Sequence, residues 1–309
     1  MKYVVTGGAG FIGSTFIDEV LRQDKESTVI CIDNFSTGFA KNIPDSFRVN
    51  IVNVDISTLI GNNENTDKVK KEIEGADYML HFAAKARVQP SIENPIEFNN
   101  TNVNGTLNVL FAAHKAGVKR VVYSASSSCY GNNKTFPTPE TELTNPLSPY
   151  GLQKYVGEQY CKMFSEVYNL DTVSLRYFNV YGERMNFEGA YKLVIAVFAE
   201  QTMQGKPLTI TNDGEQKRDF TYVGDVVKAN ILAATHSKKL NGESFNIGNG
   251  DNYSVNELAD MFGGEKQYGN KVLEPFITLA DNTKAKKILK WEPKGDLPTW
   301  VKEYKKTLK

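Results

Sequence analysis

A tyrosine and a lysine stand four residues apart in the segment SPYGLQK, at residues 148–154. Ser148 is a typical helix N-cap and Pro149 suits the first helical position, so Tyr150 and Lys154 are predicted to share one helix face. A free tyrosine has a pKa of about 10 and is a poor base at neutral pH. A neighbouring ammonium stabilises the phenolate, which would make Tyr150 a usable general base for a hydroxyl group.

A run of serines provides a second candidate group. The segment SASSSCYG, residues 124–131, directly follows the apolar run KRVVY. It is therefore expected at the carboxyl end of a strand, where open α/β sheets bind ligands. Ser126 could share a hydrogen-bond relay with Tyr150. Each segment alone is equally consistent with an exposed polar surface, so the combination carries the interpretation.

The start of the chain predicts a dinucleotide site. Residues 6–13 read TGGAGFIG and match the pattern GxGxxG, with one extra glycine at Gly7. The match follows a strand-like run and opens a helical one, which is the context of a pyrophosphate-binding turn. Asp33 ends the next β-rich run, VICID. A carboxylate there accepts ribose hydroxyls and repels a 2′-phosphate, which favours NAD over NADP.

These groups need a scaffold, and the hydrophobic pattern predicts one. Short β-rich runs alternate with helical periodicity along the first 180 residues, which indicates an α/β fold with a Rossmann-type doubly wound parallel sheet. The expected strands are 2–5, 28–32, 48–54, 77–82, 119–124 and 171–176, and the expected helices are 11–22, 96–117 and 150–168.

After Asn179 the spacing of the strand-like and helical runs changes, and a smaller α/β substrate lobe is expected. Its expected helices are 190–204, 225–235, 254–262 and 281–289, with strands near 208–211 and 244–248. The predicted domains are 1–178 for NAD and 179–309 for the nucleotide sugar, with segments of the second returning to the first.

The composition excludes several classes of protein. The 36 basic and 36 acidic residues cancel, so neither nucleic acid nor an anionic membrane is expected as a partner. No apolar run approaches the roughly 20 residues of a membrane helix, and MKYVV already reads as a strand rather than a signal peptide. The three separated cysteines favour reduced thiols and a cytoplasmic location. No Cys/His cluster has metal-ligand spacing, so no metal is expected.

Together these motifs resemble the extended short-chain dehydrogenase/reductase family, and within it the nucleotide-sugar 4-epimerases. The resemblance covers nearly the whole chain, through TGGAGFIGS, DNFSTG, HFAA, TNVNGTLNVL, SASSSCYG, SPYGLQK, RYFNVYG and GEQKRDFTYVGDV. It implies that Tyr150 is the catalytic base, that Lys154 lowers its pKa and holds the nicotinamide ribose, and that Ser126 is the catalytic serine.

The resemblance also implies the remaining site residues and a partner. For NAD it implies Gly7, Gly10, Phe11, Ile12, Asp33, Asn34, Ser36, Thr37, Gly38, Asp55, Ile56, Phe82, Ala83, Ala84, Thr101, Ser124, Tyr150, Lys154 and Phe178. For a UDP-sugar substrate it implies Arg87, Ser126, Ser128, Asn179, Thr209, Arg218, Glu274 and Thr278. A homodimer built on the helices at 96–117 and 150–168 is expected.

The residues after the catalytic serine separate the reactions of this family. Relatives that eliminate water carry an Asp-Glu pair there, and those that decarboxylate a uronate carry a glutamate. Here those positions are Ser127 and Ser128. The resemblance therefore implies oxidation at C4, rotation of the 4-keto sugar about its diphosphate link, and hydride return to the opposite face, which is 4-epimerisation.

The sugar is less constrained. Thr278 matches a size gate at which a small residue leaves room for an N-acetyl group, which favours UDP-N-acetylglucosamine and UDP-N-acetylgalactosamine over UDP-glucose and UDP-galactose. Arg87 and Lys85 could meet a carboxylate, which keeps a UDP-glucuronate 4-epimerase open. Thr211, Lys271 and Glu274 depart from the usual nucleotide-binding residues.

Two further functions are considered. An NAD(P)-dependent dehydratase or reductase of nucleotide sugars would show net nucleotide turnover. A non-enzymatic dinucleotide sensor is disfavoured, because such proteins commonly lack the tyrosine or the lysine and both are present here.

Overall fold

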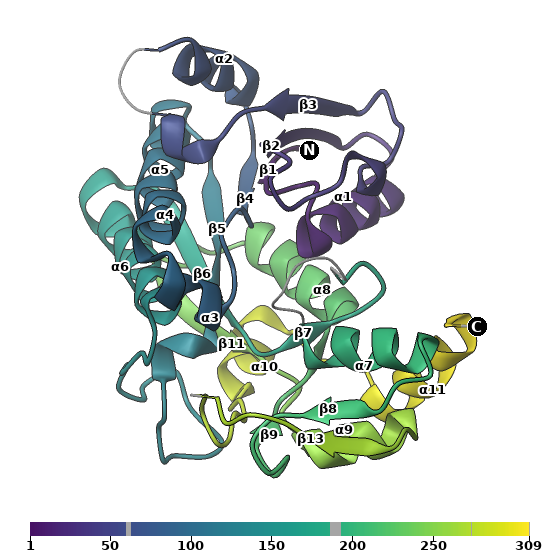
Figure 1. Cartoon of the computed structure of the whole chain (residues 1–309). Helices are drawn as coiled ribbons and strands as arrows, with labels where there is room; N and C mark the ends of the chain where they lie inside the picture. The colour runs from purple at the N-terminus through teal and green to yellow at the C-terminus, as the bar shows by residue number, and fades with distance from the viewer. Residues whose placement is uncertain (60–62, 186–192, 273, 309) are drawn as a thin grey trace.

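The computed structural model describes residues 1–59, 63–185, 193–272 and 274–308 (Figure 1). The strands of the central sheet are β1 (Lys2–Thr6), β2 (Thr28–Asp33), β3 (Val49–Asn53), β4 (Tyr78–His81), β5 (Arg120–Ser126), β6 (Asp171–Tyr177) and β11 (Glu243–Ile247). They lie in the order β11-β6-β5-β4-β1-β2-β3, and each neighbouring pair is parallel. This sheet confirms the predicted Rossmann-type fold. The strands expected in the first half of the chain differ from the observed ones by only one or two residues at either end.

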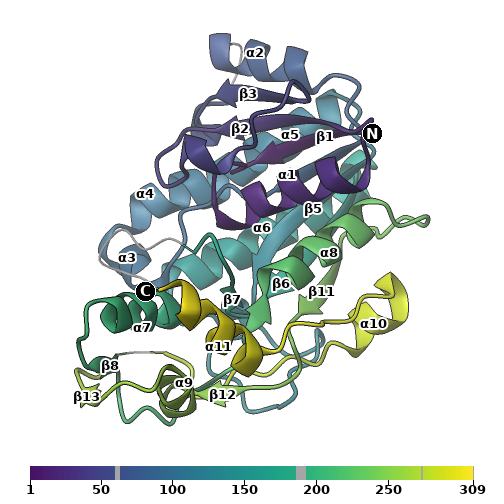
Figure 2. The same cartoon turned by 90° about the vertical axis from the view of Figure 1, so that its right-hand side faces the viewer.

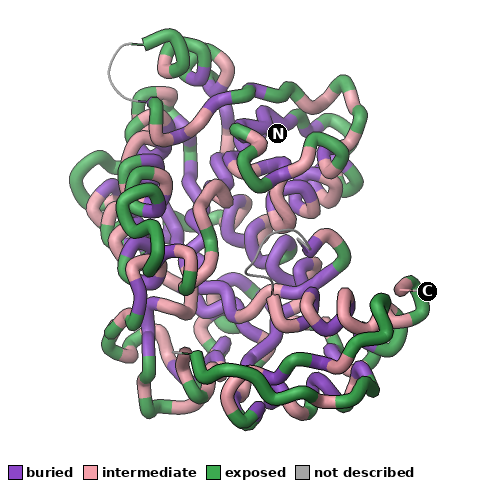
Figure 3. Tube along the Cα trace, in the orientation of Figure 1, coloured by how far each residue is buried: buried purple, intermediate pink, exposed green. Residues whose placement is uncertain are grey.

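Helices cover both faces of the sheet, as Figure 2 shows. On one face lie α1 (Phe11–Gln23), α8 (Val223–Ala234) and α10 (Thr283–Leu289), and on the other α2 (Glu64–Ile73), α5 (Thr106–Lys115) and α6 (Pro149–Tyr168). Successive strand residues point to opposite faces, so Tyr3 and Val5 join the core under α1 while Val4 joins the core under α5. With both faces covered, the strands inside the sheet are largely buried, whereas the edge strand β3 is mostly exposed (Figure 3).

The single helix expected at 96–117 is three pieces. A short α4 (Pro95–Asn99) leads into the π-helix η3 (Asn100–Gly105), and α5 follows. Gly105 faces the 3₁₀ turn η2 (Ile56–Thr58) so closely that a Cβ on it would lie 2.7 Å from Ile56 Cδ1. Apolar periodicity does not distinguish an α-turn from a π-turn, and π-turns are frequent at functional sites. Another short helix, α3 (Val88–Glu93), precedes α4.

The second half of the chain builds a smaller unit beside the sheet, at the lower right of Figure 1. Its core joins α7 (Val194–Met203), α9 (Val255–Phe262) and α11 (Leu297–Thr307) with β8 (Leu208–Ile210), which pairs with β13 (Lys266–Tyr268). The further pairs are β7 (Val180–Tyr181) with β10 (Thr221–Tyr222) and β9 (Lys217–Arg218) with β12 (Tyr253–Ser254). Residues 190–192 of the helix expected at 190–204 lie outside the described residues.

Strand β11, from the second half of the chain, completes the sheet beside β6. A buried ion pair, Arg120 Nε to Asp171 Oδ2 at 2.6 Å, joins the starts of β5 and β6. Asp171 also accepts the backbone N–H groups of Leu240 and Asn241 at 2.8 and 2.9 Å, which places the start of β11 beside β6.

In the described part of the chain, no helix is long and apolar enough to cross a bilayer.

Candidate active site

The residues predicted to hold NAD lie along one edge of the sheet, because parallel strands end at the same edge. In chain order they are Gly7, Gly10, Phe11 and Ile12 after β1, Asp33 at the end of β2, Asn34, Ser36, Thr37 and Gly38 after it, Asp55 and Ile56 after β3, Phe82, Ala83 and Ala84 after β4, Ser124 within β5, and Phe178 after β6.

The glycine loop fits a dinucleotide. Gly7 has a φ of +71°, and a Cβ on it would lie 2.6 Å from the backbone nitrogen of Ala83. A Cβ on Gly13 would lie 2.2 Å from the carbonyl oxygen of Gly7. The loop therefore packs directly on the end of β4, and Gly10 follows as the N-cap of α1. The N–H groups that begin α1, at Phe11 and Ile12, are suited to a pyrophosphate.

Asp33 retains the capacity to bind a ribose. The buried carboxylate accepts the N–H of Ala9 at 2.9 Å on one oxygen and the N–H of Phe35 at 2.8 Å on the other. A carboxylate has about four acceptor positions, so about two remain for the ribose hydroxyls. Gly38 packs against Ala9, and a Cβ there would lie 2.7 Å from the Ala9 carbonyl carbon.

The turn after β3 lies beside the turn after β2. Asp55 caps η2 by accepting the N–H of Ser57 at 2.8 Å, and it also accepts Asn34 Nδ2 at 2.8 Å. Ser36 donates its hydroxyl to Asn34 Oδ1 at 2.7 Å. The structure thus links the Asn34 turn with Asp55, Ile56 is buried beneath them, and Ser36 and Thr37 are exposed. Thr101 was also predicted to contact NAD, and it lies in the π-helix η3.

Ser126 and Tyr150, which the sequence predicts as a catalytic pair, lie within hydrogen-bonding reach of each other. Ser128 donates to Ser126 Oγ from its N–H at 3.2 Å and its hydroxyl at 2.9 Å. Both lone pairs of Ser126 are then used, so its own O–H is free to donate to Tyr150. Burial raises the pKa of the Tyr150 phenol, while the hydrogen bond with Ser126 and the charge of Arg87 lower it.

Lys154 follows Tyr150 in α6, which begins as predicted with Ser148 as N-cap accepting the N–H of Gly151 at 3.1 Å. Lys154 Nζ donates to the carbonyl oxygen of Ser124 at 2.7 Å and lies 5.0 Å from the centre of the Tyr123 ring. Burial lowers the pKa of Lys154 to about 7. The ammonium thus lies beneath the NAD edge, where a ribose hydroxyl could replace or join the carbonyl.

Three polar residues that the sequence interpretation missed hold this region together. The buried Asn102 accepts the N–H of Lys85 at 2.8 Å and donates to its carbonyl oxygen at 2.9 Å. It also donates to Gln153 Oε1 in α6 at 3.0 Å, and Ser91 Oγ accepts the N–H of Tyr150 at 3.1 Å. The motif TNVNGT contains Asn102, but its partners are distant in sequence.

The substrate residues Asn179 and Thr278 are brought together. Asn179, at a φ of +27°, donates to the Thr278 hydroxyl at 3.1 Å and to the Asp219 carbonyl oxygen at 2.9 Å. The Asp219 carboxylate, also missed, accepts the N–H groups of Asn249, Gly250 and Ala280 at 2.7 to 3.0 Å. Burial raises its pKa to about 7 against these three donors. Phe178 is buried beside this junction.

Arg218 and Glu274 also meet, as an ion pair with Nη2 to Oε2 at 2.5 Å. Glu274 Oε1 accepts Asn212 Nδ2 at 2.9 Å and Gln216 Nε2 at 3.3 Å. The arginine expected at the diphosphate is therefore partly neutralised by the glutamate expected at the nucleotide. Thr209 stands apart, exposed and bonded to Gln201 of α7 at 2.7 Å.

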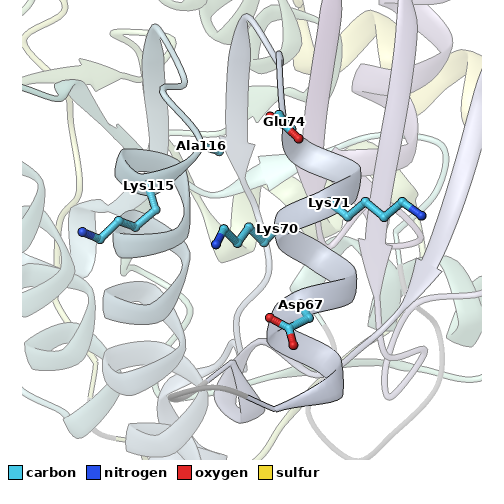
Figure 4. Close-up of a pocket in the computed structure, with 6 residues that line it drawn as sticks. All are labelled: Asp67, Lys70, Lys71, Glu74, Lys115 and Ala116. Carbon is cyan, nitrogen blue, oxygen red and sulfur yellow. The ribbon is translucent and has the colours of Figure 1, made fainter.

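A hollow between α2 and α5 is not this site (Figure 4). It measures about 290 Å³ and is lined by Asp67, Lys70, Lys71, Glu74, Lys115 and Ala116. Both helices end just before β4 and β5 begin. The hollow therefore lies at the amino edge of the sheet, opposite Ser126 and Tyr150.

Comparison with known proteins agrees with this geometry. The profile of the NAD dependent epimerase/dehydratase family matches residues 3–248. A putative UDP-glucose 4-epimerase of Methanocaldococcus jannaschii is 37% identical over 306 residues, covering 97% of this chain and 95% of that protein.

Two solved structures are similar throughout. The UDP-N-acetylglucosamine 4-epimerase of Methanobrevibacter ruminantium M1, in complex with UDP-N-acetylmuramic acid, is 32% identical, with a TM-score of 0.89 and coverage of 99% and 96%. The UDP-glucuronic acid 4-epimerase of Bacillus cereus, in complex with UDP-glucuronic acid and NAD, is 30% identical, with a TM-score of 0.89 and full coverage of both chains at 100%. These findings confirm the family predicted from the sequence: the chain belongs to the NAD dependent epimerase/dehydratase family and is an NAD-dependent enzyme.

Proposed function

We propose that this enzyme is a 4-epimerase of a UDP-sugar, with UDP-N-acetylglucosamine and UDP-N-acetylgalactosamine as its preferred pair and UDP-glucose and UDP-galactose as further substrates. The observation that carries the proposal is the pairing of Ser126 with Tyr150 at the carboxyl edge of the sheet. Ser126 is followed in the chain by two further serines, Ser127 and Ser128. Without a carboxylate at residues 127 and 128, acid–base chemistry for elimination or decarboxylation lacks its group there. Relatives named as 4-epimerases support the same reaction.

The residues have distinct roles in this proposal. NAD, held by the glycine loop, Asp33 and Lys154, supplies a hydride acceptor and donor at C4 of the sugar. Tyr150 removes the proton of the 4-hydroxyl and returns it after rotation of the sugar. Ser126, fixed as a donor by Ser128, stabilises the phenolate and keeps the phenol oriented.

The substrate would extend from Tyr150 towards the smaller unit. Asn179 and Arg218 are proposed to bind the diphosphate, with Glu274 at the nucleotide. Thr278 is small and partly exposed beside Asn179. Its size leaves room for a 2-acetamido group, which supports the N-acetylhexosamine assignment. We also propose the division of labour expected from the sequence, with residues 1–178 for NAD and 179–309 for the nucleotide sugar.

UDP-glucuronate is the second candidate. Arg87 acts electrostatically on the Tyr150 phenol, so a permanent cation lies near the expected position of the sugar. A guanidinium can bind a C6 carboxylate through two parallel hydrogen bonds. The similarity to the Bacillus cereus enzyme supports keeping this substrate in the test.

The test is a panel of UDP-hexoses, UDP-N-acetylhexosamines and UDP-glucuronate, with proton NMR of the configuration at C4. We expect interconversion of the N-acetylhexosamines with the highest kcat/KM and no accumulation of NADH. A product that has lost water or carbon dioxide, or no conversion of any sugar, would contradict the proposal.

A homodimer is proposed on α4, α5 and α6. These helices expose a set of large apolar side chains: Ile96, Phe111, Leu152, Val167 and Tyr168. Exposed apolar residues gathered on neighbouring helices are typical of an interface. Sedimentation equilibrium should give a dimer at micromolar concentration, and a dimer that persists unchanged in Leu152→Glu would exclude this surface.

A further inference from the structure

A buried polar network lies behind the candidate catalytic serine. Ser126 is the N-cap of the 3₁₀ turn η4 (Ser127–Tyr130), so Tyr130 ends the turn that the serine begins. The Tyr130 hydroxyl accepts Arg176 Nη1 at 2.7 Å and donates to Asn246 Oδ1 at 2.7 Å. All three of these side chains are buried. Because Arg176 belongs to β6 and Asn246 to β11, the end of the turn is fixed to two strands of the sheet.

The same arginine also binds the helix of the candidate base. Arg176 Nε donates to Glu158 Oε2 at 2.9 Å, and Arg176 Nη2 donates to Glu158 Oε1 at 2.5 Å. This ion pair is bidentate, and each side chain is only 5% exposed. Glu158 lies in α6, about two turns after Tyr150. One planar guanidinium therefore joins the helix that carries Tyr150 to the turn that begins at Ser126.

The turn η4 and the helix α6 also touch beside the candidate base. Gly151 directly follows Tyr150, and a Cβ on Gly151 would lie 2.7 Å from the carbonyl oxygen of Ser128. The backbone of the turn thus packs on the first turn of the helix, with no room for a side chain between them. Together with the bonds of Arg176, this contact fixes the turn against the helix at two separate places.

We propose that Tyr130 and Arg176 are positioning residues that act through Ser126. Their contact, together with the ion pair to Glu158, holds η4 against α6 at the distance at which Ser126 meets Tyr150. The inference rests on the proposed function, because it takes Ser126 and Tyr150 as the catalytic pair. A misplacement of about 1 Å in such a geometry can slow a reaction about 100-fold, so a contact that sets this distance should be visible in kcat.

Tyr130→Phe is the mildest test, because it keeps the buried ring and removes only the hydroxyl between Arg176 and Asn246. For the UDP-sugar that the substrate panel identifies, we expect kcat to fall about 10–100-fold. KM and the Kd of NAD should change less than about twofold, since the groups that bind substrate and NAD stay in place. An unchanged kcat, or a loss that appears equally in KM or in NAD affinity, would overturn the inference.

Arg120→Met is the matched control. Arg120 and Asp171 form a buried ion pair of the same kind at the amino edge of the sheet, where β5 and β6 begin. The other partners of Arg120 are backbone carbonyl oxygens at the end of α8 and just after it. At a temperature at which thermal unfolding shows both variants folded, Arg120→Met should therefore keep the kcat of the wild type. A loss of kcat as large as that of Tyr130→Phe would refute a specific positioning role.

A double-mutant cycle tests whether the two residues act as one unit. Arg176→Lys keeps a positive charge opposite Glu158, but a single ammonium lacks the fork that also reaches Tyr130. Because Arg176→Lys and Tyr130→Phe remove the same contact, the double variant should have the kcat of the more impaired single variant within about threefold. Two losses of kcat that multiply would show independent effects and would contradict the proposal.

A further readout does not depend on turnover. A hydrogen bond from Ser126 lowers the pKa of the Tyr150 phenol, so loss of that bond raises the pKa. The phenolate absorbance of the NAD-saturated protein is titrated with pH, and the titration of the same protein with Tyr150→Phe added is subtracted to isolate one of the 15 tyrosines. The midpoint should rise in Tyr130→Phe and stay in place in Arg120→Met.

The two readouts separate this inference from the proposed function. An unchanged midpoint in Tyr130→Phe would mean that Tyr130 does not act through Ser126, and the inference would fail even if UDP-sugars are epimerised. If the midpoint moves but no UDP-sugar is converted by the wild type, the proposed function fails while the positioning role of Tyr130 and Arg176 stands.

Discussion

The glycine loop can be tested directly, because two glycines of this chain have the same positive φ in different surroundings. Gly7 and Gly75 both have a φ of +71°. A Cβ on Gly75 would have no heavy atom within 4 Å, whereas one on Gly7 would lie 2.6 Å from Ala83 N and 2.8 Å from Ala83 Cα. Gly75→Ala therefore measures the effect of the positive φ without a steric contact. Gly7→Ala measures the same effect together with the displacement of the glycine loop from β4.

The expected magnitudes follow from these contacts. A left-handed conformation costs an alanine roughly 1–2 kcal/mol, which is the expected loss of unfolding free energy in Gly75→Ala. In Gly7→Ala the loop and the Ala83 backbone must separate by several tenths of an ångström, since real Cβ contacts below 3.0 Å essentially do not occur. Overpacking of this kind adds about 1–3 kcal/mol. The pyrophosphate would meet a displaced loop, so NAD affinity should fall at least about tenfold, or 1.4 kcal/mol.

Urea unfolding and isothermal titration with NAD measure the two effects. Gly75→Ala should bind NAD as the wild type does and lose only stability. If Gly7→Ala bound NAD as tightly as Gly75→Ala, the close packing of the loop on Ala83 would not be what shapes the dinucleotide site.

Three further predictions concern the base, the sheet and the sugar. Tyr150→Phe should keep NAD affinity but slow epimerisation by about 10²–10⁴-fold, measured by NMR of the C4 epimers; a smaller loss would assign the base elsewhere. Arg120→Met leaves the buried Asp171 carboxylate unpaired and should lower the unfolding free energy by about 3–5 kcal/mol in urea, so a change below about 1 kcal/mol would contradict the role of this pair. Thr278→Tyr should reduce kcat/KM for the N-acetylhexosamines about 10–200-fold relative to the plain hexoses, and unchanged selectivity would exclude Thr278 as the gate.

Local sequence patterns predicted much of the fold, because strand-like runs and helical periodicity alternate clearly in the first half of the chain. Strands buried on both faces read as apolar runs, and α6 begins with a serine cap and a proline. The helix α2 was missed, since only Val69 and Ile73 of its residues are buried and the rest of it is polar. The position of β11 beside β6 depends on Asp171 binding residues about 70 positions later, which no local pattern contains.

Some residues of the candidate site could likewise be predicted from the sequence, and others could not. Ser126, Tyr150 and Lys154 belong to short motifs with fixed spacing, so the sequence alone indicates them. Asn102 joins Lys85 to Gln153, and Asp219 joins three backbone groups from two distant segments. Such residues act through tertiary contacts, and their polar side chains look like ordinary surface residues until the chain is folded.

The ion pair of Arg218 with Glu274 could not be foreseen either. The family resemblance assigned Arg218 to the diphosphate and Glu274 to the nucleotide, without indicating that they would touch. The two residues are 56 positions apart in the chain. If Arg218 binds a diphosphate as proposed, the diphosphate shares its guanidinium with the carboxylate of Glu274. This balance of charge is a property of the folded lobe and not of either motif.

The central claim is that the hydrogen on C4 leaves the sugar and returns to the same carbon, while the 4-hydroxyl proton passes through Tyr150. The most direct measurement uses a UDP-sugar labelled with deuterium at C4, incubated with the enzyme in ordinary water and followed by NMR and mass spectrometry. The account predicts that both epimers keep deuterium at C4 and that NADH does not accumulate. Deuterium lost to water, with epimerisation proceeding, would contradict it.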